Sequence, residues 1–436
     1  MSLATPYSIR RLQRKLYVKA KQEPEYRFYL LYDKVCRDDI LLHAYRLSRA
    51  ARGAAGVDGM RFEDIEVAGV APWLAALGKE LRERTYRPAP VRRVMIPKPG
   101  GGERPLGIPT IRDRVVQTAA KLVLEPIFEA DFEDSAYGYR PRRSAQDAVR
   151  AVHTALCEGY TDVVDADLSQ YFDTIPHHEL LQSVASRVTD RHVLHLVKMW
   201  LKVPVEERDA DGRRRMSGGK RSTRGTPQGG VISPLLANLY MHRYLRTWRQ
   251  RNKGHEYRAR LITYADDFVI VSRGQAAAAL TWTREVMGRI GLTLNEAKTC
   301  IRDARTESFD FLGYTFGPDC YRQNGRWYLA AKPSKKSVQR VKAGVRAVLH
   351  PGNQARWPEV AADLNRRLRG WATYFRYGTR ARAVRAIDHY VADAVQHFLR
   401  RRHKVPTRGA RRFGPQHVFG ELGVLQLSSR VVRSAV

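Results

Sequence analysis

The sequence is poor in cysteine, in long apolar segments and in acidic side chains. Four cysteines occur among 436 residues and none belongs to a CxxC pair, so we expect neither a zinc site nor a disulfide framework. No run of 18 apolar residues occurs, which argues against a transmembrane helix. The basic N-terminus lacks the apolar stretch of a secretory signal. These absences together favour a protein of a reducing, intracellular compartment with no membrane partner.

The shortage of acidic residues points to a polyanionic partner. Asp and Glu number 44 against 77 Lys and Arg, which gives a net charge of +33 and a sequence pI near 10.4. A charge of this size is typical of proteins that bind nucleic acid. The length suits two to four domains of ~100–200 residues each, and the apolar fraction of 43% is enough to form real cores.

The positive charge is concentrated near the C-terminus. Residues 332–436 hold 23 Lys and Arg and 5 Asp and Glu, a net of +18 (23 − 5). Apolar spacing predicts helices over 334–349, 357–378 and 383–404, and Gly352 and Gly378 lie in the breaks between them. Pro333 marks the expected start of this segment.

The predicted secondary structure of the rest of the chain changes along its length. The first 85 residues look helical, over 8–20 and 26–51, whereas 86–115 has short β-like pieces around a Gly-rich tip. From 160 to 330 the pattern is mixed. We predict strands over 161–168, 260–272, 309–316 and 325–332, and helices over 115–132, 177–188, 231–250 and 276–290.

Two neighbouring aspartates interrupt the apolar run 260–272. The segment Tyr264-Ala265-Asp266-Asp267 reads as a tight turn between two strands. Adjacent carboxylates repel each other, so the pair is easier to explain if a cation binds there, and oxygen ligands suit Mg²⁺. A solvated turn is the plain alternative, since Asp is common in turns.

A second group of carboxylates lies in the segment 163–178. Asp167 ends a β-rich run, Asp165 precedes it on the same strand face, and Asp173 follows, where a capping or turn role is the simpler explanation. Carboxylates from two neighbouring strands are what a two-metal phosphoryl-transfer site requires, with ions about 4 Å apart.

Several further segments occur in an order that identifies a family. The segments are GVDGM (56–60), IPKPGGGERPLGIPTIRDRVVQ (96–117), AYGYRPRRSAQDAV (136–149), VVDADLSQYFDTIPHHELL (163–181), RGTPQGGVISPLLANLYM (224–241), YADDFVIV (264–271), GLTLNEAKTCI (291–301), FDFLGYTF (309–316) and RRLRGWATYFRYG (366–378). In this order they resemble the reverse transcriptase–maturases encoded by bacterial group II introns, over roughly 50–430.

The resemblance implies an α+β, right-hand polymerase fold. An N-terminal helical extension and the start of the fingers would occupy 1–85, and fingers and a palm with an antiparallel sheet would occupy 86–332. An α-helical thumb, or maturase domain X, would occupy 333–404. Asp167, Asp266 and Asp267 match the palm carboxylates that hold two Mg²⁺ ions, whereas Asp165 falls outside that trio and is expected to be a neighbouring or structural residue.

The resemblance also implies a nucleotide site. Lys98 and Arg104 match the residues that hold the triphosphate, Phe172 the gate that excludes a 2′-hydroxyl, and Gln228 a contact to the sugar, while Lys298 approaches the phosphates. Each has a plainer alternative: a solvated cationic loop, core packing, a turn before a helix, or a surface lysine.

Template or intron RNA contacts are expected from arginines and aromatics. The candidate arginines are Arg92, Arg366, Arg367, Arg369 and Arg380. The aromatics at helical spacing among them, Trp371, Tyr374 and Phe375, suit base stacking but equally suit the core of a helical bundle.

The resemblance implies an RNA-directed DNA polymerase of the bacterial cytoplasm that assists intron splicing and mobility. Its partners would be structured intron RNA, an RNA template with a DNA primer, dNTPs and target DNA. The short basic segment 405–436 has no CxxC pair, so we expect no endonuclease. A host-adopted repair or defence enzyme and a catalytically idle maturase remain alternatives, whereas Phe172 disfavours an RNA polymerase. The oligomeric state stays open.

Overall fold

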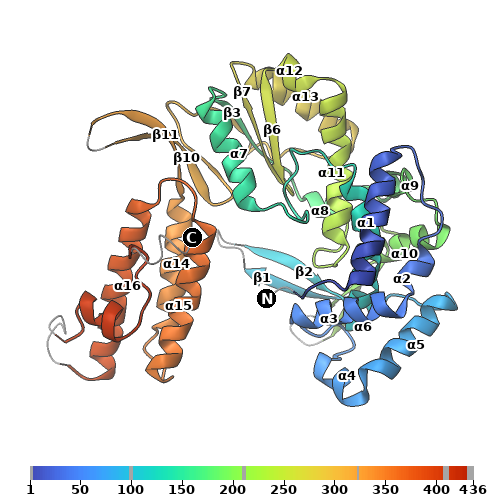
Figure 1. Ribbon diagram of the computed structural model, residues 1–436, viewed down its shortest axis with the longest axis horizontal. Coiled ribbons are helices and arrows are strands. Elements are labelled where there is room, and N and C mark those ends of the chain that lie inside the picture. The colour runs from blue at the N-terminus through green and yellow to red at the C-terminus, as the bar shows by residue number, and fades with distance from the viewer. Residues whose placement is uncertain (1–2, 98–101, 209–212, 322–323, 406–411, 430–436) are drawn as a thin grey trace.

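The chain folds into a larger mixed body with a helical bundle at its side (Figure 1). The computed structural model describes residues 3–97, 102–208, 213–321, 324–405 and 412–429. The arrangement is α+β, as predicted from the sequence. Within these ranges, no helix combines the length and the apolarity that crossing a membrane demands.

Helix α6 (Ile111–Glu129) is the centre of the helical part of the larger body. Thr110 caps it, because its side chain accepts a hydrogen bond from the N–H of Asp113. The buried residues of α6 lie on all its sides, since other helices surround it. The N-terminal helices packed against it are α1 (Tyr7–Gln22), α2 (Tyr32–Val35) and α3 (Asp38–Ala50), while α5 (Val70–Arg82) packs on α3 and α4 (Phe62–Ala68) packs on α5.

The predicted helix over 26–51 is wrong for its first six residues. Phe28 instead pairs with a distant segment: its N–H donates to the carbonyl of Arg187 at 2.8 Å, and its carbonyl accepts from Thr189 at 2.8 Å. The carboxylate of Asp190 then accepts the N–H groups of Leu31 and Tyr32, both at 2.8 Å. These long-range bonds use the groups that a helix needs, so α2 begins only at Tyr32.

Two strands expected near 86–115 belong to a four-stranded sheet. Its order is β2-β1-β4-β5, with β1 antiparallel to β2 and parallel to β4. The strands are β1 (Val91–Pro97), β2 (Glu103–Ile108), β4 (Pro204–Arg208) and β5 (Arg214–Gly218). The β1–β2 pair reaches out across the front of the molecule toward the bundle (Figure 1).

A second four-stranded sheet is antiparallel throughout and is covered on both faces. Its order is β6-β7-β3-β8. Val164 and Ile270 belong to one hydrophobic core, whereas Val163 and Val271 belong to another. Successive residues of a strand point to opposite faces, which explains the near-continuous apolar runs. The strands are β3 (Asp162–Asp167), β6 (Ala259–Tyr264), β7 (Asp267–Ser272) and β8 (Cys300–Asp303).

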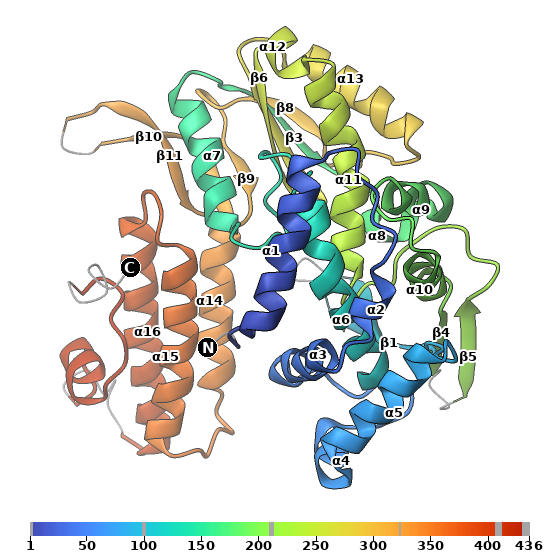
Figure 2. The same cartoon turned by 45° about the vertical axis from the view of Figure 1, so that its right-hand side comes forward.

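Two helices that contact this sheet are α13 (Ala276–Arg289), which apolar spacing predicted, and α7 (Ala145–Cys157), which it did not. Helix α7 lies between the sheet and a three-stranded sheet of order β11-β10-β9 (Figure 2). The remaining helices of the larger body are α8 (Tyr171–Thr174), α9 (His177–Ala185), α10 (Arg191–Leu201), α11 (Ser233–Gln250) and α12 (Lys253–Glu256). The strands are β9 (Phe309–Phe311), β10 (Tyr314–Cys320) and β11 (Trp327–Pro333).

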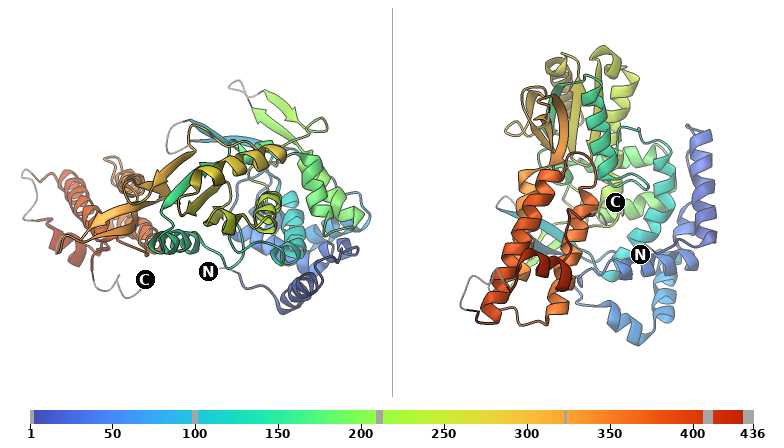
Figure 3. Two further views of the ribbon diagram at one scale, coloured as in Figure 1. Left: turned by 90° about the horizontal axis from the view of Figure 1, so that it is seen from above. Right: turned by 60° about the vertical axis from the view of Figure 1, so that its left-hand side comes forward.

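The three helices predicted after Pro333 are confirmed. They are α14 (Lys335–Val348), α15 (Trp357–Tyr374) and α16 (Ala381–Arg402). They form the bundle at one end of the molecule, opposite the N-terminal helices (Figure 3). Their buried residues share one hydrophobic core with β9, β10 and α7, so the bundle is continuous with the palm side of the chain.

The described part of the C-terminal segment, 412–429, packs onto this bundle. Val418 and Leu427 are buried in its core. The carboxylate of Asp388 on α16 accepts the N–H of Leu427 at 2.9 Å, and Asn365 on α15 accepts the N–H of Leu425 at 2.7 Å. A short π-helix (His417–Glu421) lies in this segment.

Candidate active site

The three candidate aspartates meet at one end of the β3–β7 pair. Asp167 and Asp267 lie directly opposite each other in the register of the two strands. Asp266 occupies the two-residue turn with Ala265, whose φ of 59° is unusual for a residue with a side chain. The predicted strand, tight turn and strand are therefore confirmed.

Gly138 holds this turn in place. A Cβ on Gly138 would lie 2.4 Å from the backbone nitrogen of Ala265, so only glycine fits there. Asn238 on α11 donates its amide to the Gly138 carbonyl at 2.7 Å. The N–H of Tyr137 donates to the Thr263 carbonyl at 2.9 Å, which joins this loop to the edge of β6. The turn is thus supported from a segment 127 residues earlier (265 − 138).

The carboxylates repel one another strongly. Desolvation raises the pKa of Asp267 to about 7, and repulsion from Asp266, Asp167 and Asp165 adds to the rise. Desolvation likewise raises the pKa of Asp165 to about 6. Lys298 relieves part of this repulsion, because its ammonium group lies 2.6 Å from Oδ2 of Asp167.

The donor chemistry suits a divalent cation. Carboxylate oxygens are hard ligands, and a cation would offset the repulsion that adds to the effect of burial on the pKa of Asp267. Among the described residues, no three His, Cys, Asp or Glu side chains are already arranged as a ligand set. Asp167 would first have to leave Lys298. The three carboxylates therefore fit a divalent cation once the side chain of Asp167 rotates away from Lys298.

Most residues predicted for catalysis and nucleotide binding line one cleft of about 1200 Å³. The cleft lies where the two four-stranded sheets approach each other. The predicted residues on its wall are Asp167, Asp266, Asp267, Arg104, Phe172, Gln228 and Lys298. Chain-distant residues that share no motif are therefore brought into one site.

The fingers side of the cleft contains an arginine next to the predicted RNA contact Arg92. Arg93 lines the cleft and forms an ion pair with Glu207 on β4. Arg92, the predicted contact, is absent from the described lining, and its Nε is buried. Neighbouring strand residues point to opposite faces, which accounts for the difference. Lys98 lies outside the described residues.

Phe172, the residue predicted to exclude a 2′-hydroxyl, lies beside two tyrosine rings. Phe172 is half-buried, and its ring makes edge contacts with Tyr139 and Tyr171, at centroid distances of 6.4 and 5.7 Å. Desolvation raises the pKa of Tyr139, so this phenol stays neutral beside the aspartates. Phe172 therefore has a fixed position on the cleft wall rather than a place inside the core.

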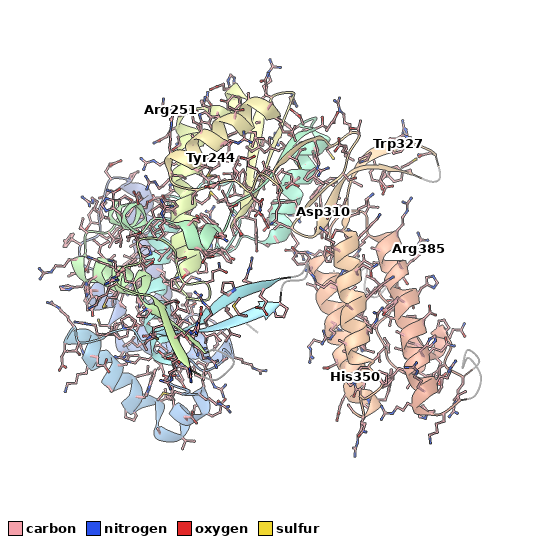
Figure 4. The ribbon with its side chains drawn as sticks, turned by 180° about the vertical axis from the view of Figure 1, so that it is seen from behind. Tyr244, Arg251, Asp310, Trp327, His350 and Arg385 are labelled. Atoms are coloured by element: carbon pink, nitrogen blue, oxygen red, sulfur yellow. The ribbon has the colours of Figure 1, made fainter. Side chains whose placement is uncertain are left out.

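The turn of FLGY links the cleft to the bundle. Leu312 and Gly313 both have positive φ, 49° and 79°, as a tight hairpin with a two-residue loop requires. Leu312 lines the cleft, while the carbonyl of Gly313 accepts hydrogen bonds from Ser334 and from the Ser337 hydroxyl, at 2.9 and 2.8 Å. Asp310, at the meeting of palm and bundle, is labelled in Figure 4.

The bundle separates its aromatics from its arginines. Trp371 and Phe375 are buried, at 8% and 5% exposure, so the core alternative holds for both rings. Arg366, Arg367 and Arg369 are exposed on α15, and Arg380 is half-exposed at the start of α16. The arginines remain available for contact with a partner, while these two rings do not.

Sequence reasoning missed several residues that shape the site. Gly138 and Tyr139 lie within a segment that was noticed only as a family block. Asn238 shows no signal of its own, because its role depends on α11 passing behind the turn. Arg93 could have been found from strand alternation once β1 was placed.

Comparisons with known proteins agree with this geometry. The pattern of the family described as reverse transcriptase (RNA-dependent DNA polymerase) matches residues 96–316, just over half of the chain. The group II intron maturase-specific domain matches residues 338–414. The chain belongs to the reverse transcriptase family and carries the maturase-specific domain of group II introns.

Particular relatives extend the match. Protein YkfC of Escherichia coli (strain K12) is 36% identical over 343 residues, covering 70% of this chain and 87% of YkfC. Group II intron-encoded protein LtrA of Lactococcus lactis subsp. cremoris is 34% identical over 223 residues, covering 49% of this chain and 34% of LtrA. A 91 kDa protein in the cob intron of Schizosaccharomyces pombe is 25% identical, covering 81% of this chain and 51% of its own length.

Among solved structures, telomerase from Candida albicans aligns over 80% of this chain and 68% of its own, with 12% identity and a TM-score of 0.41. A likeness this distant carries no argument about function.

Proposed function

We propose that the chain is an RNA-directed DNA polymerase of the bacterial cytoplasm that binds group II intron RNA and assists splicing and mobility. The observation that carries the proposal is the cleft in which Asp167, Asp266 and Asp267 face Arg104 and Lys298. Reverse transcriptases use a divalent metal, and we propose two Mg²⁺ ions held by the three aspartates. Bound there, the ions would activate the primer hydroxyl and stabilise the leaving oxygen.

The chain's own residues would orient the reactants. Arg104 carries a positive charge on β2, opposite the aspartates, and a guanidinium can bind phosphate oxygens in a bidentate manner. Lys298 would exchange its carboxylate partner for a phosphate. We propose that Lys98, which lies between β1 and β2 in the sequence, has the same role as Arg104.

Substrate selection would depend on the cleft wall. Phe172 would stand beneath the sugar of the incoming nucleotide, where a 2′-hydroxyl would meet the ring. Gln228 would contact the sugar from the adjoining loop. Contacts made equally in the ground state and the transition state leave kcat unchanged, so the loss of either contact should mainly raise KM for the dNTP.

RNA binding would rest on the bundle. We propose a division into 1–85, fingers and palm over 86–332, thumb or domain X over 333–404, and a C-terminal segment over 405–436. The exposed arginines of α15 and Arg380 would contact template or intron RNA, with Arg92 as a template contact. The other proposed partners are an RNA template with a DNA primer, dNTPs and target DNA.

The decisive experiment compares the wild type with Asp266→Asn, which is close in shape but removes one charge. The wild type should extend an oligo(dT) primer on poly(rA) with Mg²⁺, and the variant should lose that activity. Binding of structured RNA should stay within about twofold, because it depends mainly on the cationic surface. Asp363→Asn on the exposed surface of α15 is the matched control and should keep its activity.

Primer extension by Asp266→Asn at more than a few per cent of the wild-type rate would contradict the assignment. A wild type that binds RNA but extends no primer would instead indicate the idle maturase.

A further inference from the structure

Asp173 and Gln228 form a pair on the wall of the cleft, next to the gate residue. The side-chain nitrogen Nε2 of Gln228 donates a hydrogen bond to Oδ2 of Asp173 at 2.8 Å. Both side chains line the cleft that holds the aspartates. The contact joins residues 55 positions apart, and Asp173 directly follows Phe172 along the chain.

Backbone hydrogen bonds keep these two segments in register. The N–H of Thr226 donates to the Phe172 carbonyl at 2.7 Å, and the N–H of Gly225 donates to the Ile175 carbonyl at 2.8 Å. Gly225 has a φ of +92°, and a Cβ there would lie 3.1 Å from the carbonyl oxygen of Asp173. The close approach of the two loops therefore places the carboxylate beside the amide.

The carboxylate decides which way the amide of Gln228 faces. An ionised carboxylate only accepts hydrogen bonds, so it binds the NH₂ side of the amide and never the oxygen. With its nitrogen held by Asp173, Gln228 is left with Oε1 as its acceptor. A glutamine without this partner could present either end.

An acceptor at this position needs a donor on the substrate. The sugar of an incoming deoxynucleotide carries a single free hydroxyl, at the 3′ position. We propose that Asp173 is a positioning residue that orients Gln228 so that Oε1 accepts a hydrogen bond from the 3′-hydroxyl of the incoming dNTP. This inference rests on the polymerase function proposed above. It predicts that the enzyme discriminates against nucleotides lacking that hydroxyl.

Arg93 and Arg104 lie close enough to Asp173 to influence its carboxyl. Desolvation raises the pKa of this carboxyl, while the Gln228 bond and the positive charges of Arg93 and Arg104 lower it. The same arginines would come close to the triphosphate, so Asp173 also lies where the sugar and the phosphates join. The simpler alternative is that Asp173 merely ties two loops together.

The test measures single-nucleotide incorporation of a dNTP and of the matching 2′,3′-dideoxynucleotide. The wild type should prefer the dNTP by about tenfold or more, the value of one hydrogen bond to a substrate hydroxyl. Asp173→Ala should reduce that preference at least fivefold, by lowering kcat/KM for the dNTP while leaving the dideoxynucleotide nearly unchanged. Asp173→Asn retains an oxygen that can accept from Gln228 and should fall in between.

Thr174→Ala is the matched control, because Thr174 follows on the same turn and its hydroxyl bonds only to the carbonyls of Gln170 and Tyr171 among described contacts. It should keep the wild-type preference. Gln228→Ala should lose the preference, and adding Asp173→Ala to it should cost little more, since both act through one contact.

Equal losses for both nucleotides would assign Asp173 to loop structure and overturn the inference, as would an unchanged preference in a folded Asp173→Ala or Asp173→Asn variant. If the wild type and the Thr174→Ala variant both fail to extend a primer, the proposed polymerase function itself is contradicted. An active wild type with an unaltered preference in the variants would remove only the role of Asp173.

Discussion

The palm and the bundle of this chain handle charge in opposite ways. In the palm, Asp165, Asp266 and Asp267 lie close to Asp167, and burial, with repulsion between the carboxylates adding to it, raises the pKa values of Asp165 and Asp267. In the bundle, arginines are spread over an exposed helix face, and Arg366 forms a surface ion pair with Asp363 at 2.7 Å.

This difference in charge arrangement matches the separate tasks proposed for the two regions, which are catalysis in the palm and RNA binding in the bundle. The palm needs each carboxylate at one place, so backbone contacts such as Gly138 against Ala265 fix its turn. The bundle needs density of charge rather than position, because counterion release depends on how many phosphates are neutralised. Single substitutions should therefore have large effects in the palm region and small, additive effects in the bundle.

The largest effect on stability is expected from Glu129→Gln. The buried Arg140 guanidinium forms an ion pair with Glu129 at 2.8 Å, with side-chain exposures of 4% and 17%. Removing one charge leaves the other buried without its partner, which should cost about 3 kcal/mol of unfolding free energy. Urea unfolding measures it. Asp363→Asn, which breaks the exposed pair in the bundle, should cost less than 1 kcal/mol; equal losses would erase the contrast.

Two glycine substitutions, one beside the palm turn and one in the bundle, test whether activity responds differently in the two regions. Gly138→Ala forces the backbone of Ala265 to move, and a displacement near 1 Å at a catalytic group costs on the order of 100-fold in rate. Gly370→Ala on α15 meets nothing within 4 Å and should keep the rate, with a gain of about 0.5–1 kcal/mol in helix stability. Primer extension and thermal unfolding measure both. A fully active Gly138→Ala variant would mean that the turn tolerates displacement.

The stability of the protein at acid pH should depend on His242, a partly buried histidine of helix α11. Burial lowers the pKa of His242 to about 4, and Arg246 and Arg249 add to the shift. The folded state keeps the ring neutral while the unfolded state protonates near pH 6.5, so the contribution of His242 to stability falls as the pH drops from 6.5 to 4. His242→Gln should make the protein about 1–2 kcal/mol less sensitive to acidification to pH 5.

Unfolding free energies at pH 7 and pH 5 give the comparison, with His350→Gln in the bundle as control, since His350 is exposed (Figure 4). An identical pH dependence for wild type and His242→Gln would show that the ring protonates in the folded state.

The smallest effect is expected from one arginine of the bundle. Arg369→Ala should weaken RNA binding a few-fold and reduce the slope of log K against log salt by about 0.7–0.9, the value of one phosphate contact. The rate of primer extension by the bound complex should stay the same. A slope equal to that of the wild type would remove Arg369 from the RNA surface.

Local patterns predicted many of the elements but not α7, α10, β4, β5 or β8, and long-range contacts decided where one predicted helix was wrong. The strand–turn–strand of Tyr264–Asp267 was predictable because apolar runs bracket it on both sides. The start of α2 was not, because Phe28 pairs with residues near 188 and Asp190 captures the N–H groups that follow. Periodicity contains no information about partners 160 residues away.

The same limit applies to the site. Motif matches named most residues of the cleft, because each motif carries its own chemistry. The pair of Asp173 and Gln228 needed the two loops to be seen side by side, and Asp173 alone suggested only a turn. The choice of Arg93 over Arg92 followed from the direction of one strand, which the sequence pattern of β1 leaves ambiguous.

The position of β3 in its sheet has a consequence for synthesis of the chain. Both neighbours of β3 in the sheet, β7 and β8, lie later in the sequence, and β7 begins 100 residues after β3 ends (267 − 167). At about 5–20 residues per second, the nascent strand stays unpaired for roughly 5–20 s. Apolar strands left open in this way tend to pair with other chains, and charges are what prevent it. Asp162, Asp165 and Asp167 place three such charges on β3. We therefore expect carboxylates at and beside the proposed active site also to keep the strand from aggregating before its partners are made.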